Sequence, residues 1–106
     1  TTTIVWMGEF GRTPRINGGQ GRDHFPNAWS TVVGGGGIRG GRVFGRTSAD
    51  GMVVDTAHQR AIATKDLIAT VCRALGIDPR GTNMSNVGRP IPIADRDSQP
   101  IREILA

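Results

Sequence analysis

The sequence predicts an α/β chain, and three observations lead to that class. The opening segment 2–7 is rich in β-branched residues and stops at Gly8, which is typical of a short buried strand ending in a tight turn. Residues 65–75 repeat apolar side chains with the 3.6-residue period of a helix. The 16 glycines among 106 residues are about twice the average share, so much of the remaining backbone is expected in turns and loops.

A chain of 106 residues with 37% hydrophobic content can form one modest core, so we expect residues 1–106 to be a single domain. We expect an incomplete domain, because the chain lacks an initial Met and enters a strand pattern at once. The missing N-terminal part of the same protein is then its first expected partner. The one cysteine, Cys72, excludes an internal disulfide and is expected to be buried. No apolar run approaches about 18 residues, so no membrane span is predicted.

Loops and short strands are predicted between the first strand and the helix. Residues 10–27 lack periodicity and are rich in Gly, Pro, Asn and Arg, so we expect a long ordered loop. Residues 29–33 fit a second strand. The four glycines at 34–37 favour a close-packed turn over an anion-binding cradle. A small hairpin is predicted for residues 42–54, whose two arms alternate around a Ser-Ala-Asp-Gly turn signal.

The helix is the clearest element, and its ends carry the expected signals. Thr64 is the expected N-cap, and Gly76 fits the position just after the C-terminal end. Residues 81–86 are expected to be irregular. The prolines of 89–93 favour an extended edge segment, and 100–106 fit one or two terminal helical turns.

Three residues near the first strand could bind a metal. Asp23 and His24 are adjacent in a Gly-rich loop, and carboxylate and imidazole are ligand types that hold catalytic zinc. Glu9 follows the end of the first strand, where open α/β sheets place their ligand crevices. The alternatives are an Asx turn with a solvated His24, and a salt bridge from Glu9 to Arg12 or Arg22. His58 is expected to be an ordinary surface histidine.

The charge balance favours anion recognition over nucleic-acid binding. Twelve arginines and one lysine face nine acidic residues, for a net charge of +4. Arginine binds carboxylates, phosphates and sulfates in a bidentate manner, although a GC-rich genome would also raise the arginine content. A nucleic-acid surface would carry lysine and exposed stacking aromatics, and this chain has no tyrosine. Elbow-serine, Walker, paired-cysteine and dinucleotide-binding motifs are also lacking.

Five blocks of sequence, in order, resemble the C-terminal portion of the DUF1501 family: EFGRTPRI, GRDHFPNAWS, VVGGGGIRGGRVFGRT, KDLIATVCRALGID and GRPIPI. That family is grouped with the alkaline phosphatase and sulfatase superfamily. The resemblance implies an α/β sandwich around a mostly parallel sheet, with metal ions at the carboxyl edge of the strands. Similar proteins often carry export signals, so a location outside the cytoplasm is expected by analogy.

The resemblance also implies roles for individual residues. Glu9 falls at the metal-binding aspartate of the superfamily, Gly11 at its glycine and His24 at a downstream ligand histidine. Phe10 stands where the second ligand histidine is usual, which is a departure from the pattern because phenylalanine cannot coordinate a metal.

On this hypothesis Asp23 is a ligand or orients His24, and Arg12 or Arg22 contacts the oxyanion of the substrate. The implied cofactor is a divalent metal: zinc, calcium or manganese. The implied substrate is a small or polymeric phosphate or sulfate ester, and the nucleophile lies upstream. Two alternatives remain open. One is a non-catalytic structural relative, and the other is a small module that binds anions or nucleic acid through its arginines.

Overall fold

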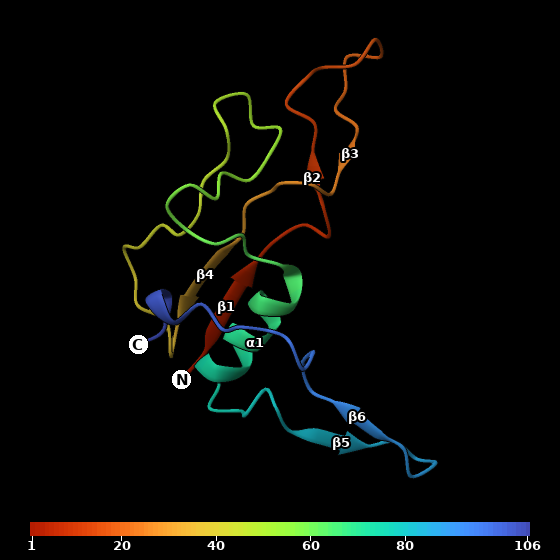
Figure 1. Ribbon diagram of the computed structural model, residues 1–106, viewed down its shortest axis with the longest axis vertical. Coiled ribbons are helices and arrows are strands. Elements are labelled where there is room, and N and C mark those ends of the chain that lie inside the picture. Colours follow the sequence, from red (N-terminus) through yellow and green to blue (C-terminus); the bar gives the residue numbers. More distant parts are fainter. The chain divides into compact units, whose positions relative to one another are not determined.

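The computed structural model describes all residues 1–106 as short strand pairs, one α-helix and connecting loops (Figure 1). The strands form three two-stranded pairs, β1 with β4, β2 with β3 and β5 with β6. The structure contains no helix with the length and hydrophobicity of a membrane span. In chain order the elements are β1 (Thr3–Trp6), β2 (Gly11–Arg12), β3 (His24–Phe25), β4 (Val32–Gly35), α1 (Thr64–Ala74), β5 (Thr82–Met84), β6 (Pro90–Pro92) and the 3-10 turn η1 (Arg102–Ile104).

The chain divides into two compact units. The first unit contains Thr1–Ile4, Gly34–Arg42 and Ile62–Ala106, and the second contains Val5–Val33 and Val43–Ala61. The β2–β3 and β5–β6 pairs are antiparallel. The mostly parallel sheet that the resemblance implies is not seen, so the fold of this chain is a mixture of short strand pairs and one helix.

The predicted helix is confirmed as α1, and its ends follow known capping chemistry. The N-cap is Ala63 rather than the expected Thr64, because the Asp66 carboxylate accepts a hydrogen bond from the Ala63 amide at 3.1 Å. At the other end Gly76 has a φ of 77°. Its amide donates to the Arg73 carbonyl at 3.0 Å. With the Ile77 amide bonded to the Cys72 carbonyl at 2.8 Å, this is a Schellman motif.

The core of the first unit lies along one side of α1. Leu67, Ala69 and Cys72 are buried there, together with Ile101 and Ile104 from the C-terminal tail. Cys72 is therefore buried, as expected. Hydrogen bonds also connect the helix to the tail. The Asp66 carboxylate accepts a hydrogen bond from the Gln99 amide at 2.8 Å, and the Ile101 amide donates one to the Thr70 hydroxyl at 2.9 Å. The tail 99–101 is thereby fixed to the helix, which the apolar period alone did not predict.

The first strand forms where predicted but is not buried. Ile4 is 61% exposed and Trp6 is 77% exposed, so the face of β1 that these two side chains share is open. The expected second strand at 29–33 begins later, at Val32, and extends into the glycine run. Gly35 is required there, since a Cβ would lie 2.1 Å from the Thr2 carbonyl oxygen. The close-packed turn predicted at 34–37 is confirmed only at Gly36 and Gly37, because Gly34 and Gly35 belong to β4.

Two further predictions need correction. The expected hairpin at 42–54 is reduced to a single antiparallel bridge between Thr47 and Val54, closed by the Ser48-to-Gly51 turn. Residues 81–86 are not irregular, because Thr82–Met84 form β5 and pair with β6. The extended segment at 89–93 is confirmed as β6, and the terminal helical turn as η1.

Candidate functional site

The expected loop at 10–27 is in fact a hairpin with a long folded tip. Gly11 pairs with Phe25, and Arg12 pairs with His24. The Thr13 amide donates to the Asp23 carbonyl at 3.0 Å, which makes Thr13 and Asp23 a hydrogen-bonded pair. Because the two kinds of pair alternate, Arg12 and His24 form a non-hydrogen-bonded pair, in which opposite side chains lie closest. Two residues predicted for the site, twelve positions apart, are therefore direct neighbours.

One face of this hairpin carries three stacked side chains, Phe10, Arg12 and His24, which we call the β2–β3 face. The Phe10 ring lies 4.0 Å from the His24 ring, centroid to centroid, with 36° between the planes. The Arg12 guanidinium carbon lies 5.6 Å from the centroid of the same ring, within the range of a cation–π contact. Phe10 is half-buried, whereas Arg12 and His24 are exposed. The phenylalanine thus forms a platform for both polar groups.

Gly11 is held at its position by close packing. A Cβ on this residue would lie 2.5 Å from the Ala28 carbonyl oxygen and 2.7 Å from the Cβ of Trp29. Phe25 and Ala28 are buried beside it, so the segment after β3 crosses directly over the hairpin. Only glycine fits under this crossing. The packing therefore requires glycine at position 11.

The tip of the hairpin is held by polar contacts that the sequence did not indicate individually. The Asn17 carboxamide oxygen accepts the Gly19 amide at 2.9 Å and the Gly21 amide at 3.0 Å, and its nitrogen donates to the Asp23 carboxylate at 2.9 Å. The only signal for this role was Asn followed by two glycines, a common turn sequence. Asp23 therefore has a structural role as well, because its carboxylate accepts the hydrogen bond that positions Asn17.

Both arginines predicted for catalysis donate to backbone carbonyls. Arg22 Nη1 donates to the Thr13 carbonyl at 2.8 Å and to the Pro14 carbonyl at 2.5 Å, and Arg12 Nη1 donates to the Arg22 carbonyl at 3.2 Å. Arg22 therefore ties the two sides of the tip together. Arg12 makes one such bond and leaves its other donors on the exposed face, so it is the better placed of the two to meet an anion.

The expected metal ligands do not form a complete group in this chain. Glu9, Asp23 and His24 are exposed, and Glu9 makes no ion pair with Arg12 or Arg22. Their atoms are suitable donors, but no three His, Cys, Asp or Glu side chains lie close enough together to share an ion.

Two carboxyl groups of the segment 46–55 have lowered pKa values. Hydrogen bonds from Ser48 lower the pKa of Asp50, and the Ala57 amide and Arg46 lower that of Asp55. These carboxyl groups stabilise the turn and the bridge at residues 46–55. Both are partners of local bonds, so the lowered pKa values reflect loop structure and do not mark a site.

Comparison with known proteins agrees with the motif pattern. The model of a family described as a protein of unknown function, DUF1501, matches residues 1–105. No curated protein and no solved structure matches the chain. Because the family match covers all but the last residue, the chain belongs to the DUF1501 family.

Proposed function

We propose that this chain supplies one side of a metal-dependent site that hydrolyses phosphate or sulfate esters, within an alkaline phosphatase-like α/β sandwich. The observation that carries the proposal is the direct pairing of Arg12 with His24, two residues for which the superfamily resemblance implies site roles. An exposed guanidinium beside an exposed imidazole is suited to an anionic ester. The nucleophile and further ligands come, on this proposal, from the preceding part of the same protein.

Each residue has a distinct part in the proposal. His24 and Glu9 provide donor atoms for the metal, and Arg12 faces the oxyanion of the ester. Asp23 acts by orienting the hairpin tip through Asn17, the contact its carboxylate makes at 2.9 Å. Arg22 acts by holding the tip closed. A zinc, calcium or manganese ion would polarise the ester oxygen in such a site.

A second candidate is a non-catalytic relative that keeps only the architecture. It is favoured by the ring contact of Phe10 with His24, which occupies one face of the imidazole, and by the lack of a complete ligand group. On this reading the β2–β3 face is a packing surface. The two candidates differ in whether metal binding depends on His24.

The test is metal analysis of the full-length protein after loading with zinc, calcium or manganese in turn. The hydrolase proposal expects a stoichiometric metal that is lost in His24→Ala and kept in His58→Ala, a matched loss of the other histidine. Phe10→His is expected to increase metal retention, because it would restore a ligand where the superfamily has one. Absence of metal under every loading condition would reject the proposal.

A second test measures the hydrolytic activity of the same full-length protein. Hydrolysis of a chromogenic phosphate or sulfate ester that disappears in Glu9→Ala would exclude the non-catalytic reading. Arg12→Gln is expected to lower kcat/KM by at least about tenfold, the effect of removing a positioned donor to a developing charge. Arg15→Gln removes the same charge from the hairpin tip and serves as its control.

A further inference from the structure

Two dipeptides of the second unit have a sequence that is prone to succinimide formation. Asn17 and Asp50 are each followed by glycine, and no other asparagine or aspartate of the chain is. In such a pair the backbone nitrogen of the glycine attacks the side-chain carbonyl carbon of the preceding residue, because no Cβ hinders its approach. The structure distinguishes the two pairs by the contacts of the attacking nitrogen and of the carbonyl group.

The attacking nitrogen is free at Asn17. The Gly18 amide makes no hydrogen bond within the chain. Apart from its own chain neighbours, nothing lies within 4 Å of the position that a Cβ of Gly18 would take. A hollow of about 370 Å³ is lined by Asn17 together with Thr13, Arg15, Asp23 and Met52. Water and hydroxide therefore have access to the Asn17 carboxamide.

The carboxamide of Asn17 is polarised for attack. Its oxygen accepts hydrogen bonds from the Gly19 amide at 2.9 Å and from the Gly21 amide at 3.0 Å. Attack at the carboxamide carbon moves negative charge onto this oxygen, and backbone amide donors stabilise such an oxyanion. Both donors belong to the hairpin tip, so they are in place before the reaction begins.

Asp50 is protected at both groups. The Gly51 amide donates to the Ser48 carbonyl at 2.9 Å, so the nitrogen that would attack is engaged. Hydrogen bonds from the Ser48 side chain and the Met52 amide lower the pKa of the Asp50 carboxyl and keep it ionised. An ionised carboxylate is a poorer electrophile than a carboxamide. Of the two dipeptides, the structure therefore favours reaction at Asn17.

We propose that Asn17 is a modification site at which the chain reacts with itself, and that the product releases the hairpin tip. The Gly18 nitrogen bonds to Cγ of Asn17, and the bond from Cγ to Nδ2 breaks. The Gly18 amide gives its proton to solvent, and the departing nitrogen takes one up and leaves as ammonia. Water then opens the succinimide ring at either carbonyl, which gives aspartate or isoaspartate at position 17.

The modification removes one contact of the tip and replaces it with repulsion. At present Nδ2 of Asn17 donates to the Asp23 carboxylate at 2.9 Å. A carboxylate at position 17 has no proton to donate at neutral pH, and it places a second negative charge beside Asp23. Since Asp23 directly precedes His24, the released backbone adjoins the β2–β3 face. This consequence holds whether or not that face binds a metal.

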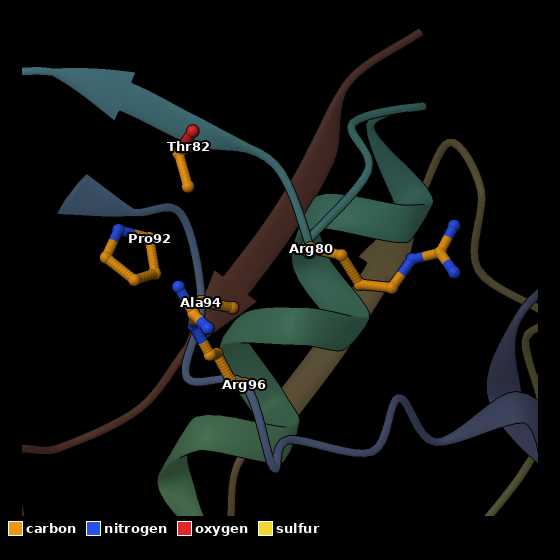
Figure 2. A pocket seen from close by; sticks show the side chains of 5 residues that line it. All are labelled: Arg80, Thr82, Pro92, Ala94 and Arg96. Carbon is orange, nitrogen blue, oxygen red and sulfur yellow. The ribbon is translucent and has the colours of Figure 1, made fainter. Parts of the chain in front are cut away.

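Asn83 provides the internal control for the reaction. It lies in β5 and pairs with Ile91 of β6, so the strand ladder fixes its backbone. Figure 2 shows part of this hairpin, with the preceding residue, Thr82, on β5. Asn83 is exposed, and its chain neighbour on the attacking side is Met84. Water therefore has access to both asparagines, but only Asn17 is followed by an unhindered nitrogen.

The test follows the modification of the full-length protein by mass spectrometry. The protein is incubated at mildly alkaline pH, and trypsin then releases residues 16–22 as one peptide, whose mass rises when the amide becomes a carboxyl group. Asn17 is expected to react at least about tenfold faster than Asn83, because its oxyanion has two aligned donors. Gly18→Ala should slow the reaction about tenfold, since the methyl group keeps the nitrogen from its attacking position. Gly40→Ala, at an equally open glycine of the first unit, should leave the rate unchanged.

Two results would overturn the assignment of the site. One is an Asn17 that stays intact in the folded protein and loses ammonia only in urea, which would show that the folded tip prevents the reaction. The other is isoaspartate formation at Asp50, detected by enzymatic methylation, at the same rate as at Asn17. That result would show that engagement of the glycine amide has no effect.

Release of the tip is tested with variants that carry the product directly. Asn17→Asp should speed amide hydrogen exchange at residues 13–23 by about threefold or more, the effect of losing one hydrogen bond. Asn27→Asp, the same change at an exposed position outside the tip, should not. Adding Asp23→Asn to Asn17→Asp exchanges the two partners, so the bond re-forms and slow exchange should return. Exchange that stays fast in this double variant would overturn the proposed release.

Discussion

The buried hydroxyl of Thr70 accepts a hydrogen bond of 2.9 Å from the backbone amide of Ile101, which lies 31 residues further along the chain. The same hydroxyl donates to the Asp66 carbonyl at 2.6 Å. Thr70 is fully buried and Ile101 is 5% exposed, so water cannot replace either bond. One side chain therefore connects the middle of α1 to the tail that covers it.

Thr70→Val is expected to destabilise the first unit. The substitution keeps the shape of the side chain but leaves the Ile101 amide buried without an acceptor, which costs about 1–3 kcal/mol. Urea denaturation followed by far-UV circular dichroism measures the change in the free energy of unfolding. Thr64→Val, on an exposed position of the same helix, should change it by less than about 0.5 kcal/mol. Equal effects of the two substitutions would contradict the role of Thr70.

Gly11→Ala is expected to disrupt the β2–β3 hairpin. The new methyl group would lie 2.5 Å from the Ala28 carbonyl oxygen and 2.8 Å from that of Phe25, both of which belong to backbone that cannot easily move. The expected loss is about 1–3 kcal/mol, the usual cost of overpacking. Gly18→Ala is the control, because nothing lies within 4 Å of its added methyl group. Amide hydrogen exchange at residues 11–25 should increase in the first variant only.

Asp78 is expected to titrate at unusually low pH. Hydrogen bonds from the Arg80 side chain, and then from its backbone amide, lower the pKa of this carboxyl from 3.8 to about 2. Since the folded pKa is the lower one, the contact favours the folded chain above pH 3.8 and is lost as the pH falls to about 2. Arg80→Gln should raise the pKa in an NMR titration, and Arg89→Gln should not. A pKa that is the same in all three proteins would refute the assignment.

The ring contact of Phe10 should be visible in the NMR spectrum of His24. Phe10→Leu removes the aromatic ring 4.0 Å from the imidazole, so the ring-current shift of the His24 protons should disappear. The second unit should lose about 0.5–1.5 kcal/mol, the usual value of an aromatic pair. Phe44→Leu is the matched control outside the β2–β3 face. His24 signals that do not move would show that the rings are not stacked in solution.

Local signals predicted much of the fold. Helix α1 followed from its apolar period and from Gly76, and β6 followed from prolines that tolerate only an edge. Both depend on residues close together in sequence. The exposure of β1 and the late start of β4 depend instead on distant partners, such as the Thr2 carbonyl against Gly35, and no local pattern encodes these.

The geometry of the candidate site depends on distant contacts in the same way. Residue types identified Arg12 and His24, but their direct pairing depends on the register of a hairpin that the sequence did not predict. The sequence also did not predict that Arg22 holds the hairpin tip together, since this role depends on the carbonyls of Thr13 and Pro14.

The exposure of Trp6 gives the protein a built-in optical reporter. The chain has two tryptophans and no tyrosine, so its ultraviolet emission comes from Trp6 and Trp29 alone. Trp6 is 77% exposed, whereas the indole nitrogen of Trp29 is buried without a hydrogen-bond partner. A collisional quencher such as acrylamide would therefore quench the longer-wavelength fluorescence of Trp6 first. The remaining shorter-wavelength fluorescence of Trp29 would then report on the segment that crosses over Gly11, without any attached dye.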